Sequence, residues 1–146
     1  IQPETRRDLL GNTLILVGGA GAPPVTLDAT LDLAGLLAGG RLSMALIESV
    51  PAGQYGKEAL QSLGLWAGVE ASVVQSENVR AALQLVALGE APYGVVYASD
   101  ALAEPEVTQV GTFPEDSYTP IVYPAALTAT AGQDAAGFLD YLGSDP

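Results

Sequence analysis

The chain has 146 residues, 49% of them apolar, which is enough for one domain with a buried core. The formal net charge of −12 argues against a nucleic-acid partner and against docking on an anionic membrane surface. Cysteine and histidine are both absent, which excludes disulfides, thiolate chemistry, histidine-based acid–base catalysis and the usual zinc sites.

The first ten residues are expected to be a connection that arrives from elsewhere. Ile1 is not an initiator methionine and no signal peptide is visible, so we expect that the start was removed or never included. Gly11 and Asn12 are a turn signal, and residues 18–24 are predicted to be a Gly/Ala/Pro loop.

Apolar periodicity predicts the elements that follow. In chain order they are a strand over 13–17, a helix over 27–37, a strand over 42–47, a helix over 52–63, a strand over 69–74, a helix from a Ser76 cap to about Leu88, strands over 93–97 and 107–113, an extended run over 121–127 and a helix over 132–142. This alternation implies an α/β fold with a mixed, mostly parallel sheet of about five strands flanked by helices, as one domain over residues 1–146.

The stretch from Ser49 to Leu60 is predicted to be a sharp helix start after a strand. Pro51 suits the first helical position, and the next two amides, on Ala52 and Gly53, then lack an intrahelical partner. Such a helix end can hold an anion without a basic side chain. Ordinary helix initiation explains the same residues, so this motif alone leaves both interpretations open.

Two further features fall on the same predicted edge of the sheet. Ligands of α/β sheets sit beyond the carboxyl ends of the strands, where helix N-termini gather. The helix start at Ser76–Val79 and Tyr97, at the end of its strand, share that edge with Ala52. The pattern therefore predicts an anion or a small polar ligand on a neutral, amide-rich rim.

Several segments form a recognisable series: SVPAGQYGKEAL at 49–60, LGLW at 63–66, ENVRAAL at 77–83, GEAPYGVVYA at 89–98, GTFPEDS at 111–117 and IVYPAA at 121–126. Together these segments resemble the periplasmic molybdate-binding proteins of ABC importers. The matches keep their order and span nearly the whole chain. Leu46-Ile47 and residues 117–120 depart from the family pattern, which bears on fine ligand selectivity more than on fold.

The resemblance implies a periplasmic-binding-protein-like lobe, the second of the two lobes that close on a ligand about a hinge. Hinge segments are expected near 13–17 and 121–127, with a C-terminal helix near 132–142 and lobe one absent from this chain. The family's donors to the oxyanion map onto the amides of Ala52 and Val79 and the hydroxyl of Tyr97. The implied ligand is molybdate or tungstate, with little discrimination between them, and no cofactor is expected.

Each of these residues also has a structural interpretation. The Val79 side chain is expected in the core, with only its amide at the ligand, and Tyr97 can instead be a strand-end aromatic with its hydroxyl in water. Asp100 and Glu104 are expected to be solvated surface charges rather than metal ligands. Arg80 is expected to pair with a nearby carboxylate. Tyr55 and Trp66 are expected to pack in the core or between lobes.

The resemblance favours a solute-binding component that delivers molybdate or tungstate to an ABC permease, in the periplasm or lipid-anchored after secretion. As an isolated lobe it is expected to bind weakly or not at all, without the other lobe's donors. A sensor domain of a transcriptional regulator is an alternative, and a non-binding lobe that self-associates is another. An enzyme is not expected, because histidine, cysteine and a close acid–base pair are absent.

Overall fold

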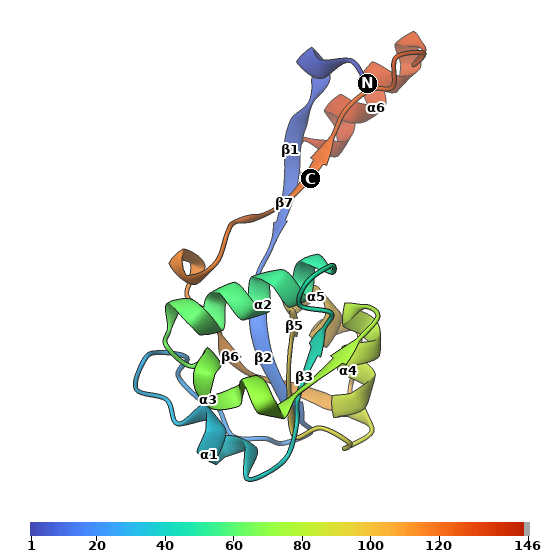
Figure 1. The fold of residues 1–146 in the computed structure, drawn as a ribbon. Coiled ribbons are helices and arrows are strands. Elements are labelled where there is room, and N and C mark those ends of the chain that lie inside the picture. The colour runs from blue at the N-terminus through green and yellow to red at the C-terminus, as the bar shows by residue number, and fades with distance from the viewer. Residues whose placement is uncertain (145–146) are drawn as a thin grey trace. The chain divides into compact units, whose positions relative to one another are not determined.

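The fold of residues 1–144 is described by a computed structural model (Figure 1). Its contacts divide the chain into two compact units: residues Thr13–Thr119 form one, and Ile1–Asn12 with the segment from Pro120 onward form the other. We describe each unit by itself. Among the described residues, no helix has the length and apolar character that a membrane crossing needs.

A five-stranded sheet forms the centre of the larger unit, in the order β4-β3-β5-β2-β6. Its strands are β2 (Leu14–Gly19), β3 (Leu42–Ala45), β4 (Val73–Ser76), β5 (Tyr93–Tyr97) and β6 (Val107–Thr112). β3 pairs in parallel with β4 and β5, whereas β2 is antiparallel to both β5 and β6. Only β2 therefore opposes the common direction, which confirms the predicted mixed, mostly parallel sheet.

The central strands are apolar because both faces of the sheet are covered. Residues 14–17 of β2 are fully buried, and so are Val95 and Val96 of β5. A strand buried on both faces reads as a continuous apolar run rather than an alternating one. This explains why the pattern identifies β2 and β5 so directly.

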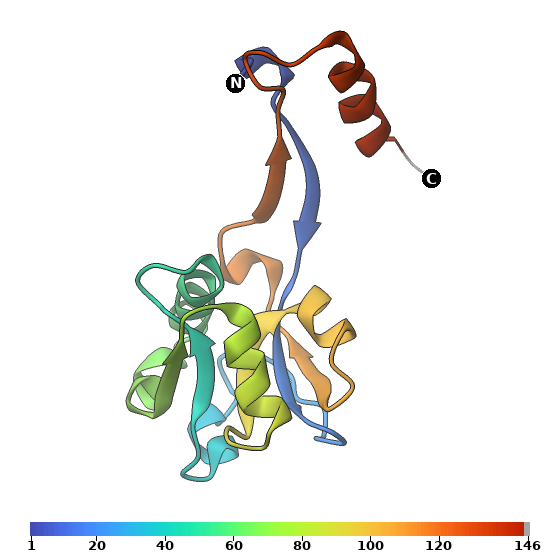
Figure 2. The same cartoon turned by 90° about the vertical axis from the view of Figure 1, so that its right-hand side faces the viewer.

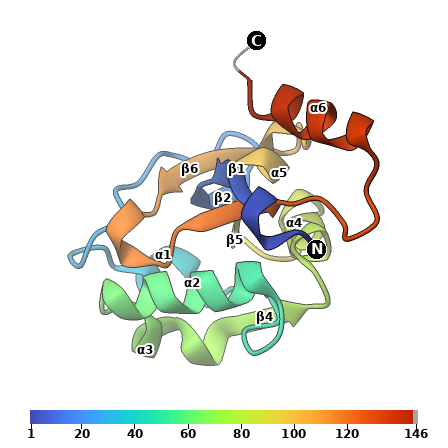
Figure 3. The same cartoon turned by 90° about the horizontal axis from the view of Figure 1, so that it is seen from above.

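The two longer helices of this unit, α2 (Pro51–Ser62) and α4 (Val79–Ala87), cover opposite faces of the sheet. The hydroxyl of Ser43 on β3 donates to the carbonyl of Ala82 on α4, at 2.7 Å. The next residue, Met44, lies against Gly56 of α2. Because neighbouring residues of a strand point to opposite faces, the two helices lie on opposite sides. Figures 2 and 3 show the same arrangement, with α4 on one side of β5 and α2 on the other.

The first helix is shorter than predicted. The pattern predicts a helix over 27–37, but α1 spans only Leu33–Leu37. Asp28 accepts hydrogen bonds from the hydroxyl and amide of Thr30, at 2.6 and 2.8 Å, and these bonds hold its pKa below the usual value. Asp32 then caps the amide of Gly35. Such local side-chain bonds compete with helix, so the helix cannot begin earlier.

The region before β4 also differs from the prediction. Residues 69–74 are predicted as a strand, but Trp66–Val69 form the short helix α3 and Glu70–Ser72 a 3-10 turn, η2. Trp66 and Val69 are both buried, three residues apart, which suits one helical turn rather than an extended strand. The strand β4 therefore begins only at Val73.

Other boundaries shift by a few residues. α4 begins at Val79 rather than after a Ser76 cap, because the side chain of Asn78 caps the amide of Ala81 at 2.8 Å. The strand expected over 42–47 ends at Ala45. A short helix that the pattern does not predict, α5 (Ala98–Leu102), follows β5, and the loop after β6 contains the 3-10 turn η3 (Glu115–Ser117).

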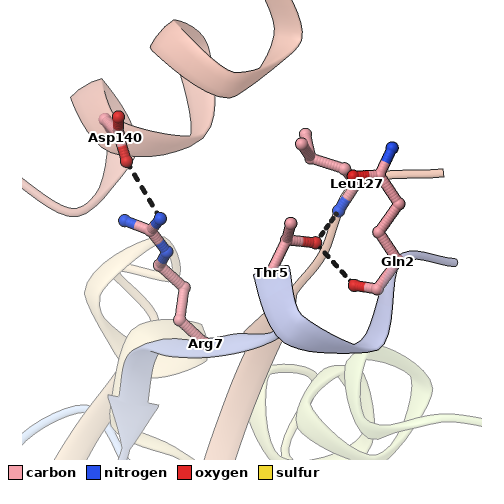
Figure 4. A network of polar contacts seen from close by, with 5 residues as sticks. All are labelled: Gln2, Thr5, Arg7, Leu127 and Asp140. Carbon is pink, nitrogen blue, oxygen red and sulfur yellow. Dashed lines mark hydrogen bonds and ion pairs between the residues drawn. The ribbon is translucent and has the colours of Figure 1, made fainter.

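The smaller unit contains a two-stranded antiparallel ribbon, β1 (Arg7–Asn12) with β7 (Ile121–Ala125), the 3-10 turn η1 (Pro3–Thr5) and the helix α6 (Gln133–Leu142). The expected connection over the first ten residues is thus wrong from Arg7 onward. The polar contacts that join the chain ends are drawn in Figure 4. Thr5 donates to the carbonyl of Gln2 and accepts from the amide of Leu127, and Arg7 pairs with Asp140 at 2.9 Å.

Candidate functional site

The carboxyl ends of three neighbouring parallel strands form one edge of the sheet. β3 lies between β4 and β5, with Ala45 level with Ser76 and Ser43 level with Gly94. Each of the three predicted site residues follows or ends one of these strands: Ala52 comes after β3, Val79 comes after β4, and Tyr97 ends β5. The topology therefore places all three at the same edge.

The start of α2 lies directly against the end of β3. The amide of Gln54 makes the first helical bond, to the carbonyl of Val50, at 3.0 Å. Within residues 1–144, the amides of Ala52 and Gly53 make no hydrogen bond to the protein. A Cβ atom on Gly53 would lie 2.4 Å from the carbonyl oxygens of Ala45 and Leu46, so the helix end approaches the strand as closely as it does only because this residue is glycine.

The start of α4, like that of α2, has first-turn amides without an acceptor among the described residues. Asn78 caps this helix with both its side chain and its carbonyl, which accept from Ala81 and Ala82. The amides of Val79 and Arg80 have no acceptor among the described residues. The Val79 side chain packs against the core cluster around Ile15 and Val17, as expected, so its amide is the group free to bind a ligand.

Tyr97 stands at the turn from β5 into α5. Its amide donates to Oδ2 of Asp100 at 3.1 Å, and the amide of Ala98 donates to the carbonyl of Thr13 at 2.9 Å. Asp100 is only 7% exposed, so the expectation of a solvated surface charge is wrong for this residue. Glu104 is half-buried and accepts from the side chain of Gln84 and the amide of Glu106.

A contact that the sequence does not reveal joins the loop before α2 to β4. The amide of Ile47 donates to the side-chain oxygen of Gln75 at 2.8 Å, and the amide of Leu46 donates to the carbonyl of Ser76 at 2.9 Å. The loop that leads to Ala52 is thereby tied to the strand that leads to Val79. No local signal could identify Gln75, because the contact depends on the register between β3 and β4.

The remaining expectations concern packing and charge. Trp66 is buried, with the ammonium of Lys57 5.5 Å from its ring centroid, and the half-buried Tyr55 packs near Tyr118.

Arg80 makes no ion pair within the part of the chain that the structure describes, so the prediction of a carboxylate partner for Arg80 is wrong. No cluster of three or more acidic residues that could hold a metal ion occurs among the described residues. The candidate donors at this edge, two backbone amides and a phenol hydroxyl, carry no formal charge.

All of residues 1–146 match the family model of bacterial extracellular solute-binding proteins, and the chain belongs to this family. It is 43% identical to the molybdate-binding protein ModA of Escherichia coli, over 97% of this chain and 56% of that protein. For ModA of Haemophilus influenzae the identity is 40%, over 97% of this chain and 57% of that protein. The chain thus spans about half the length of the curated relatives it matches.

Solved structures agree with this relationship. The substrate-binding domain of a putative molybdenum ABC transporter from Clostridium difficile superposes with a TM-score of 0.83 at 28% identity, over 99% of this chain and 62% of that chain. The periplasmic molybdate-binding protein of Azotobacter vinelandii shares the fold, with a TM-score of 0.72 at 22% identity, over 98% and 63%. The family resemblance drawn from the sequence motifs is thereby confirmed.

Proposed function

We propose that this chain binds molybdate as an oxyanion through the amides of Ala52 and Val79 and the hydroxyl of Tyr97. The observation that carries the proposal is the pair of helix starts at one sheet edge whose first-turn amides have no acceptor within residues 1–144. Unpaired amides at the N-terminus of a helix favour an anion. The two relatives named molybdate-binding proteins support the choice of oxyanion.

The chemistry of the donors suits a tetrahedral dianion. Uncharged donors avoid the cost of burying a cation, and the N-terminal ends of α2 and α4 add partial positive charge. Three hydrogen bonds of roughly 1.5–3 kcal/mol each, less the cost of association, leave binding that is about millimolar at best. We expect tungstate, which is nearly the same size, to bind equally well, and the smaller sulfate to bind less well.

The wider role that we propose is that of a solute-binding component of an ABC importer, in the periplasm or lipid-anchored. The relatives are solute-binding proteins, and one is named a putative ABC transporter substrate-binding lipoprotein, from Bacillus subtilis. The partners would be an ABC permease and a further lobe like the remaining half of the curated relatives. The hinge would use the segments near 13–17 and 121–127. We propose no enzymatic activity.

A titration of the isotope-labelled chain followed by amide chemical shifts tests the proposal, because this method detects millimolar binding at single residues. Molybdate and tungstate are expected to shift the amides of Ala52, Gly53 and Val79 saturably. Sulfate and phosphate serve as controls and are expected to shift them less. Equal responses to sulfate or phosphate and to molybdate would show that the oxyanion assignment is wrong.

Tyr97→Phe is expected to weaken molybdate binding roughly 10-fold or more, because it removes the hydroxyl that we propose as a hydrogen-bond donor to the charged ligand. The same titration measures the change. Tyr141→Phe is the matched control, since Tyr141 is an exposed residue of α6, far along the chain from the candidate donors. If Tyr97→Phe binds molybdate as tightly as the parent chain, the hydroxyl is not a donor.

Self-association of this chain is a second proposal, supported by the exposed apolar residues of α6. Phe138 and Tyr141 are 62% and 72% exposed. Phe138 is also one of the α6 residues that, together with residues between 125 and 131, line an apolar groove of about 300 Å³. Apolar patches of this kind often bind partners. Sedimentation velocity at rising concentration measures the oligomeric state, and a monomer at every concentration would reject self-association.

A further inference from the structure

Asp100 differs from the other described carboxylates of this acidic chain because it is buried. The sequence carries 17 acidic residues, and Asp100 is the one that is buried among the described residues. Burying a charge is costly unless it is paired or hydrogen-bonded. Asp100 makes no ion pair within residues 1–144, and it accepts a hydrogen bond from the amide of Tyr97 at 3.1 Å.

The bond from Tyr97 acts at a defined point of the backbone. Tyr97 is the last residue of β5 and has extended dihedrals, φ −84° and ψ 151°, while Ala98 begins α5. The carboxylate of Asp100 holds the peptide before Tyr97, and the carbonyl of Thr13 holds the peptide after it. Two anchored peptides determine the direction of the Cα–Cβ bond, and with it where the phenol ring can reach.

We propose that Asp100 is a positioning residue for oxyanion binding, one that orients Tyr97 through its backbone amide. This inference rests on the proposed function, in which the Tyr97 hydroxyl donates to the ligand. Asp100 does not touch the ligand itself, and its charge would repel a dianion. What matters is therefore its acceptor oxygen.

If Asp100 acts as a hydrogen-bond acceptor, two substitutions of this residue are expected to differ in their effect on molybdate binding. Asp100→Asn keeps an oxygen that can accept from the Tyr97 amide, whereas Asp100→Ala removes it. We expect Asp100→Ala to weaken molybdate binding about tenfold, the effect of one lost positioning bond, and Asp100→Asn to stay within about threefold of the parent. Amide hydrogen exchange at Tyr97, measured without ligand, is expected to accelerate in Asp100→Ala and to recover in Asp100→Asn.

Asp32→Ala is the matched control. Asp32 also accepts from a backbone amide at a helix start, that of Gly35 at 2.9 Å, but on α1, which precedes β3 rather than following a strand at the candidate edge. It is expected to change stability without changing molybdate affinity. Asp100→Val, which also lacks an acceptor oxygen, replaces Asp100→Ala if the alanine variant does not fold.

The outcomes distinguish this inference from the proposed function. Parent-like molybdate affinity in Asp100→Ala would overturn the positioning role, and so would equal losses in the alanine and asparagine variants. If the unsubstituted chain binds no molybdate, the proposed function fails. In that case unchanged hydrogen exchange at Tyr97 in Asp100→Ala would show separately that Asp100 does not hold its backbone.

Discussion

Val79→Pro is expected to weaken molybdate binding roughly 10- to 100-fold, the effect of losing one hydrogen bond to a charged ligand. Proline deletes the proposed donor, because it has no N–H. The substitution suits this position, since Val79 is the first residue of α4 and Asn78 before it is extended, with φ −154° and ψ 169°. Titration of the labelled chain with molybdate measures the loss.

Gln133→Pro is the matched control for this substitution. Gln133 is the first residue of α6, and Gly132 before it is also extended, with φ −76° and ψ 172°. It is expected to leave molybdate affinity unchanged. If Val79→Pro keeps α4, judged by its amide spectrum, and still binds like the parent, Val79 is not part of the site. Ala52→Pro is a poorer test, because it would follow Pro51 and force that helical residue out of the α region.

Gly53→Ala is expected to lower the free energy of unfolding by about 1 to 3 kcal/mol, the usual range for overpacking a tight contact. The added methyl group would lie 2.4 Å from two backbone carbonyl oxygens, those of Ala45 and Leu46. Backbone atoms at the end of a central strand cannot move aside as a flexible side chain can. The start of α2 must therefore shift, and urea denaturation measures the cost.

The same shift is expected to weaken molybdate binding, because it displaces the amide of Ala52. Gly68→Ala is the matched control, since its new methyl group would meet only Cβ of Ala34, at 3.9 Å. Alanine in a helix is preferred over glycine by up to about 1 kcal/mol, so this control is expected to be neutral or slightly stabilising. Unchanged stability in Gly53→Ala would contradict the close approach of α2 to β3.

The elements that could be predicted are those whose signal is local. Residues 93–97 form a strand and Pro51–Ser62 a helix, because apolar runs and a proline at the first turn suffice to specify them. The pattern is wrong where side-chain bonds compete with periodicity. Asp28 and Asp32 delay α1 in this way. It also misses β1, whose strand conformation depends on pairing with β7, more than a hundred residues away.

For the candidate site as well, the local features could be predicted and the long-range ones could not. Capping residues and strand ends are local features, so the sequence motifs suffice to indicate that Ala52 and Val79 lie at helix starts after strands and that Tyr97 ends a strand. The order of β3, β4 and β5 as parallel neighbours, the contact of Gly53 with the end of β3 and the burial of Asp100 become apparent only in the folded chain. Those facts depend on strand order, register and close packing, which bring together residues that no spacing along the chain connects.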